Sequence, residues 1–215
     1  MKKPFLLAVV LLIASAASFA DITFYSQPWG GGITLCDQNN SRCLPFQGFP
    51  NGITVYDNFI VPNGVTKVTG FTYVDGLGLG SWSDYISTNW TVFGPNASNP
   101  FGAPTYSGTA VATLTNPVGP FFTLSITGLN LAVTPGTWIV GFQNNMSGVD
   151  ITYRGDSLFG DGVFWAQDNT GTLQETLSGG DTAFSVSTTV PEPFTLLLLG
   201  PGLLGGVRFN RGKLR

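Results

Sequence analysis

The strongest constraint in this sequence is a two-residue alternation of apolar and polar side chains. The run from Phe122 to Thr127, for example, alternates Phe, Leu and Ile with Thr and Ser. Successive side chains of a strand point to opposite faces, so this period predicts strands with one buried face. About a dozen short segments fit this description, namely 22–25, 33–36, 53–61, 67–74, 86–92, 109–115, 122–127, 129–133, 138–142, 149–153, 162–167 and 184–187.

Turn residues such as Asn51-Gly52 and Pro135-Gly136 separate these segments. The glycine-rich stretch from Asp75 to Gly80 is predicted to be a loop for the same reason. Many short strands with turns roughly every 8 to 12 residues predict an all-β, antiparallel β-sandwich. A jelly roll is the favoured form, and an up-and-down barrel is the alternative. Uneven loops such as Gly94 to Ser107 favour the sandwich.

The charge of the chain excludes several classes of function. Residues 21–190 carry eleven acidic and three basic side chains, a net charge of −8. Such a surface repels nucleic-acid backbones and anionic lipid headgroups, so no nucleic-acid partner is expected. The chain also contains no His. This removes the commonest general base and zinc ligand, and we expect a protein without catalytic residues.

The first twenty residues have the layout of a secretory signal peptide. Lys2 and Lys3 precede an apolar run from Phe5 to Ile13, and small residues follow as far as Ala20. This order predicts cleavage between Ala20 and Asp21 and export across the inner membrane. An uncleaved N-terminal membrane helix is the alternative.

The last residues, 191–215, combine three features in order. Pro191, Glu192 and Pro193 precede an apolar segment from Phe194 to Val207, and four bases follow it, Arg208, Arg211, Lys213 and Arg215. Fourteen helical residues span only about 21 Å of a hydrocarbon core of roughly 30 Å. The segment is therefore a marginal permanent anchor. The bases would hold the tail in the cytoplasm while the body lies outside.

This tail, VPEPFTLLLLGPGLLGGVRFNRGKLR, resembles the PEP-CTERM sorting signal of exported bacterial proteins. The resemblance implies a short transmembrane helix and removal of the tail by an exosortase, a membrane-embedded cysteine protease, on the way to the cell surface or extracellular matrix. Phe194 stands where a small residue is commoner, and Pro201 interrupts the apolar run. A plain C-terminal anchor is the alternative. The body, 21–190, is only weakly similar to sandwich domains that precede such tails, with GDTAFSVS as the closing strand.

The chain has two cysteines, Cys36 and Cys43. In an exported protein this pair predicts a disulfide. Closing so short a loop should stabilise the fold by about 2 to 3 kcal/mol on the chain-entropy model. Two Cys without His make a poor metal site.

The carboxylates raise two further hypotheses. Asp156 with Asp161 or Asp168 could form the acid pair of a glycosidase, although Asp beside Gly, Asn or Ser usually stabilises a turn. Oxygen-bearing side chains also gather in Asp37–Asn40 and in Asp150–Asp168. These make calcium a candidate cofactor, although neither stretch has the spacing of an EF-hand loop, and no metal ligands are assigned.

Five Trp residues divide into two groups. Trp90, Trp138 and Trp165 fall on predicted strands and are expected in the core. Trp29 and Trp82 fall in predicted loops, where their flat rings could stack on sugars.

Three functions follow from these observations. The first is an exported, non-catalytic protein of the cell surface or extracellular matrix, processed by signal peptidase and an exosortase, with a structural or adhesive role in envelope or biofilm. The second is a carbohydrate-binding module for the producer's exopolysaccharide, using Trp29 and Trp82. The third is a secreted hydrolase with an Asp pair.

Overall fold

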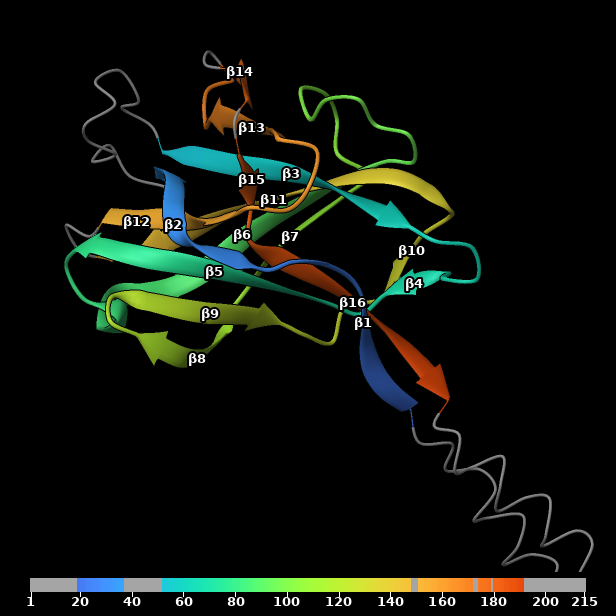
Figure 1. Cartoon of the computed structure of the whole chain (residues 1–215), viewed down its shortest axis with the longest axis horizontal. Coiled ribbons are helices and arrows are strands. Elements are labelled where there is room, and N and C mark those ends of the chain that lie inside the picture. Colours follow the sequence, from blue (N-terminus) through green and yellow to red (C-terminus); the bar gives the residue numbers. More distant parts are fainter. Residues whose placement is uncertain (1–18, 37–51, 148–150, 172–173, 179, 192–215) are drawn as a thin grey trace, which may run out of the picture. The chain divides into compact units, whose positions relative to one another are not determined.

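The structure is a computed structural model that describes residues 19–36, 52–147, 151–171, 174–178 and 180–191 (Figure 1). The chain forms two compact units. One is Thr23–Thr188, and the other joins residues 1–22 with 189–215, of which 19–22 and 189–191 are described. Within the described ranges, no helix is both long and apolar enough to cross a membrane.

Eight strands form one antiparallel sheet. They are β1 (Phe19–Gln27), β2 (Trp29–Cys36), β5 (Gly70–Leu79), β8 (Thr113–Val118), β9 (Phe121–Ile126), β12 (Ile151–Ser157), β15 (Asp181–Thr182) and β16 (Phe184–Pro191). The long strand β5 organises this sheet. One of its edges pairs with β9, and the other pairs first with β16 and then with β12. β15 pairs with the end of β12 on the edge that also meets β5, β2 pairs with the other edge of β12, and β1 lies beside β16.

Six strands form a second antiparallel sheet in the order β14-β13-β3-β11-β6-β7. They are β3 (Ile53–Val61), β6 (Tyr85–Phe93), β7 (Tyr106–Ala110), β11 (Gly136–Met146), β13 (Val163–Asp168) and β14 (Gln174–Ser178). A two-stranded sheet joins β4 (Lys67–Val68) to β10 (Leu131–Ala132), and a 3-10 helix, η1 (Trp82–Asp84), precedes β6.

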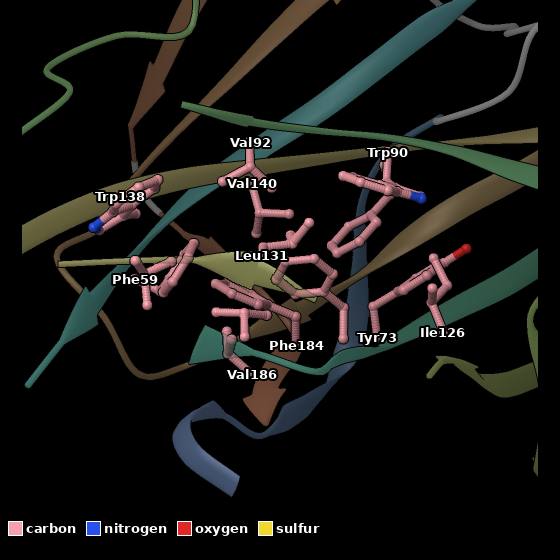
Figure 2. Packing of buried hydrophobic residues seen from close by; sticks show 14 of the residues in the cluster. Phe59, Tyr73, Trp90, Val92, Ile126, Leu131, Trp138, Val140, Phe184 and Val186 are labelled. Carbon is pink, nitrogen blue, oxygen red and sulfur yellow. The ribbon is translucent and has the colours of Figure 1, made fainter. Parts of the chain in front are cut away.

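The main hydrophobic core lies between the two large sheets. Phe71, Phe184 and Ile126 come from the eight-stranded sheet, and Phe59 and Val140 from the six-stranded sheet, each 3% exposed or less. Figure 2 shows the labelled side chains of this cluster gathered between the strands. Burying such apolar surface is the main driving force for folding, and here it holds the two layers together as a β-sandwich.

A second apolar cluster covers the other face of the six-stranded sheet. Tyr56, Phe93, Ile139 and Trp165 pack together there, with Phe101 from the loop after β6 against them. Both faces of this sheet are therefore buried near its centre, which explains why β11 reads as a nearly continuous apolar run rather than an alternation.

The all-β prediction is confirmed, and so is the burial of Trp90, Trp138 and Trp165, which are 7%, 2% and 6% exposed. The predicted loop at Asp75–Gly80 is wrong, because β5 continues through Leu79. Gly76 and Gly78 serve packing rather than a turn. A Cβ added at Gly76 would lie 2.6 Å from the Phe121 ring, and one at Gly78 would lie 2.3 Å from the Tyr153 ring.

Candidate functional site

A charged pair lies in the interior between the sheets. The Nε atom of Arg154 is 2.9 Å from Asp75 Oδ1, and the two side chains are 1% and 0% exposed. Both come from the eight-stranded sheet, where Arg154 of β12 lies opposite Asp75 of β5. From the facing sheet, the Asn144 amide donates to Asp75 Oδ2, and the Phe142 carbonyl accepts from Arg154 Nη2 at 3.3 Å. Hydrogen bonds between the Arg154–Asp75 pair and residues of the facing strand thus connect the two sheets.

Aromatic rings and hydroxyls extend this network. The Tyr73 ring stacks on Phe142 with centroids 4.4 Å apart, and the Arg154 guanidinium lies 4.4 Å from the Tyr73 centroid. The Tyr73 hydroxyl donates to Asn144 Oδ1 at 2.9 Å and also bonds Thr88. Burial raises the pKa of Tyr73 well above its usual value, so it stays a neutral donor. We call these residues, with Asp75, the interior network.

A second polar cluster lies around Asp57 of β3. The backbone N–H and hydroxyl of Thr182 donate to Asp57 Oδ2 at 2.6 and 3.0 Å, and the Asn58 N–H donates to Oδ1 at 2.7 Å. In the orientation that satisfies its neighbours, the Gln27 amide donates to Asp57 Oδ2 at 3.0 Å and accepts from Tyr25 at 3.0 Å. Asp57, 1% exposed, therefore joins β3 of one sheet to β15 of the other.

Two more carboxylates complete this group. Asp181 Oδ2 accepts from the Gly162 N–H at 2.8 Å, while its Oδ1 is buried and accepts no hydrogen bond. Asp161 accepts from the Val163 N–H at 3.0 Å and from the Asn58 amide at 2.7 Å. We call Asp57, Asp161 and Asp181 the carboxylate cluster.

Burial and repulsion between carboxylates favour the protonated forms of Asp57 and Asp181. Burial raises the pKa of Asp57 to about 7, and the charge of Asp181 adds to this, although hydrogen bonds from Thr182 and Asn58 oppose it. Burial likewise raises the pKa of Asp181, and the charge of Asp161 raises it further. Like charges in a poorly solvated place disfavour the ionised form.

The carboxylates singled out by the sequence do not act as one set. Asp156 lies in β12 opposite Thr182, and Asp161 belongs to the carboxylate cluster. Asp168 ends β13 and accepts hydrogen bonds from the Thr170 hydroxyl at 2.9 and 3.0 Å, which is a turn-stabilising role.

Within the described part of the chain, no three His, Cys, Asp or Glu side chains are arranged to hold a metal ion. Asp37–Asn40 and Asp150 lie outside the described residues.

The sequence did not predict the interior network or the carboxylate cluster, although the strand pattern contains a signal for both. In β3 the residues that share the core face are Ile53, Val55, Asp57, Phe59 and Val61. Asp57 thus occupies a core position of a clear alternation, as Asp75 does after Phe71 and Tyr73 in β5. A carboxylate at a core position indicates a buried partner, because an isolated buried charge is very costly.

The structure separates the two Trp residues proposed for glycan stacking. Trp29, half-buried in β2, contacts Phe121 with ring centroids 4.6 Å apart. Trp82, half-buried in η1, packs 5.2 Å from Phe122 beside the main core, and its indole N–H donates to the Pro120 carbonyl at 3.1 Å. Phe121 and Phe122 are consecutive in β9 and point to opposite faces. Trp29 and Trp82 therefore do not share one surface.

The predicted processing points lie at the ends of neighbouring strands. Ala20 and Asp21 are in β1, and Pro191 is the last residue of β16. Glu192 and Pro193 lie outside the described residues, as does the signal segment 1–18. Cys36 ends β2 opposite Tyr153. Cys43 lies outside the described residues, so the disulfide stays a prediction.

No protein-family model matches the chain, and no curated protein is significantly similar to it.

The interior network leads to a prediction about stability. Asp75→Asn keeps the shape of the side chain but leaves the Arg154 charge buried without its counter-ion. We expect the free energy of unfolding at pH 7 to fall by about 3 to 5 kcal/mol in urea denaturation. Asp84→Asn, in η1 outside the network, is the control and should change it by less than about 0.5 kcal/mol. A loss below about 1 kcal/mol for Asp75→Asn would show that the pair does not contribute as described.

Proposed function

We propose that this chain is an exported, non-catalytic protein of the cell surface or extracellular matrix, with a structural or adhesive role in envelope or biofilm. The observation that carries the proposal is a sequence pattern: Pro191-Glu192-Pro193 is followed by an apolar segment and then by terminal bases, and residues 1–20 resemble a secretory leader. In this proposal signal peptidase cuts after Ala20, and an exosortase recognises the Pro-Glu-Pro motif while a short helix holds the tail in the inner membrane.

The position of the two ends supports this proposal. β1, which contains Ala20 and Asp21, is a neighbour of β16, which ends at Pro191 (Figure 1). A body whose first and last strands lie side by side can be attached to one membrane through both ends without unfolding. The buried interior network and the apolar clusters supply a stable body for use outside the cell, and a Cys36–Cys43 disulfide would add to its stability.

The finer architecture belongs to the same proposal. We propose a jelly-roll-like path for the sandwich, which the order of the six-stranded sheet supports, because β3 lies between β11 and β13 rather than beside its neighbours in sequence. Helices formed by the signal segment and by the tail would flank it. Calcium is an untested candidate cofactor of the loops.

Intact mass spectrometry tests the sorting proposal. The intact mass of protein recovered from the membrane and from the culture supernatant of the native host is measured before and after reduction. We expect a released form that starts at Asp21, ends between Pro191 and Pro193, and gains the mass of two hydrogens on reduction.

Variants make this test specific. The Glu192→Ala protein should keep its tail and accumulate in the membrane, because its Pro-Glu-Pro motif is altered. The Glu175→Gln protein, which is changed in β14, is the control and should be processed normally. A wild-type protein that stays in the membrane and ends at Arg215 would contradict processing and favour a lasting anchor. Masses that do not change on reduction would contradict the disulfide alone.

A carbohydrate-binding function is the second candidate, and one contact favours it. Trp29 and Phe121 form an aromatic pair, and the Phe121 ring covers Gly76 on the face of the sheet that points away from the main core. Flat aromatic rings on a sheet face can stack on sugar rings, and the half-buried Trp29 retains accessible surface. Trp82 is less suited to this role, because its ring packs beside the core.

Affinity electrophoresis in gels containing the producer's exopolysaccharide separates these two tryptophans. If the glycan hypothesis holds, the polysaccharide slows the wild-type protein, Trp29→Ala loses most of this retardation, and Trp82→Ala keeps it. Thermal unfolding of both variants provides the control for folding. Equal retardation of wild type and Trp29→Ala, or no retardation of the wild type, would exclude Trp29 as a stacking residue.

A further inference from the structure

The carboxylate cluster brings three acidic side chains together from three separate segments. Asp57 comes from β3, Asp161 from the loop between β12 and β13, and Asp181 from β15. Gly160 of that loop packs directly on the cluster. A Cβ added there would lie 2.5 Å from both Asp181 Oδ1 and Gln27 Nε2. The loop backbone therefore closes over the carboxylates and limits access of water to them.

No described side chain supplies a compensating positive charge. The described residues include two basic side chains, Lys67 and Arg154. Arg154 is paired with Asp75, and Lys67 stands in β4 opposite Ala132. The groups that face the cluster are neutral donors. They are Tyr25 and Gln27 from β1, Asn58 from β3 and Thr182 from β15.

One buried oxygen in the cluster lacks a hydrogen-bond partner. Asp181 Oδ1 is buried and accepts no hydrogen bond, and Asp181 is 3% exposed. The charge of the nearby Asp161 carboxyl raises the pKa of Asp181, in addition to the larger effect of burial. Both effects disfavour the ionised form of Asp181.

We propose that the buried Asp57 and Asp181 hold protons in the closed state and that, together with Asp161, they form a proton-dependent latch that closes the sandwich between β3, β15 and the 158–163 loop. When Asp57 and Asp181 are protonated, the latch is held by the Thr182 and Gly162 N–H bonds. When they are ionised, no described side chain compensates the repulsion within the cluster, and this repulsion opposes the same closure. Thr182 and Ala183 lead directly into β16, so the latch fixes the beginning of the last strand.

The direction of the pH effect follows from linkage. The pKa of Asp57 rises to about 7 in the folded protein from an ordinary value of 3.8. The folded state thus holds a proton that the unfolded state releases, and this stability is fully present below the unfolded pKa and lost as the pH rises through about 7. Asp181 shifts in the same direction.

The test is urea unfolding of the full-length protein from pH 5 to pH 8 with EDTA present. Between pH 5 and 6.5 we expect the unfolding equilibrium constant to rise about tenfold per pH unit for each proton held. Asp181→Asn should reduce this dependence of the unfolding equilibrium constant on pH. Asp161→Asn, which changes an exposed side chain, should reduce it as well. Asp84→Asn, outside the cluster, should keep it. If these carboxylates had a purely structural role, each substitution would lower the free energy of unfolding equally at every pH. The pH dependence of unfolding would then stay unchanged.

Hydrogen exchange gives a local readout of the same latch. After correction for intrinsic exchange rates, protection of the Thr182 and Gly162 amides should fall between pH 6 and 8 in wild type and not in Asp161→Asn. Unchanged slopes and unchanged protection in both cluster variants would overturn the proposal. It would also be overturned if millimolar Ca²⁺ abolished the pH dependence of the wild type through Asp181, because the cluster would then hold a metal ion rather than a proton.

Discussion

The ion pair of Arg154 and Asp75 is the contact on which the interior of this protein depends. It places two full charges between sheets whose main core is apolar. The facing sheet helps to compensate their desolvation with the Asn144 amide and the Phe142 carbonyl. This arrangement requires one relative register of the two layers, whereas apolar packing alone tolerates small shifts.

The carboxylate cluster compensates the cost of burying ionisable groups in a different way. There, acids from both sheets meet without a basic partner among the described residues, and neutral donors such as Thr182 and Gln27 surround Asp57. One group relies on a counter-ion, and in our proposal the other relies on protons held by Asp57 and Asp181. Between them they join the layers at the centre and at β15, and the neighbouring strands β1 and β16 carry the two predicted processing points.

The sequence predicts the strands well where apolar side chains recur at every second position, and less well elsewhere. The predicted segment 53–61 coincides with β3, in which every second residue from Ile53 to Val61 is buried. The Asp75–Gly80 error arises because glycine serves both turns and close packing under aromatic rings, and only the partners Phe121 and Tyr153 distinguish the two uses. The contacts of Asp57 with Thr182 and of Asp161 with Asn58 join segments distant in sequence, so no local pattern reveals them. Of these residues, only Asp57 occupies a core position that is visible in the alternation of its strand.

The buried charge of Arg154 can be measured directly by NMR of the full-length protein labelled with ¹⁵N-arginine. Comparison with Arg154→Lys assigns its Nε–H resonance. Because this group lies 2.9 Å from Asp75 in a closed interior, we expect its proton to exchange with water far more slowly than that of free arginine at neutral pH. Exchange as fast as in free arginine would contradict a sandwich organised around a buried ion pair.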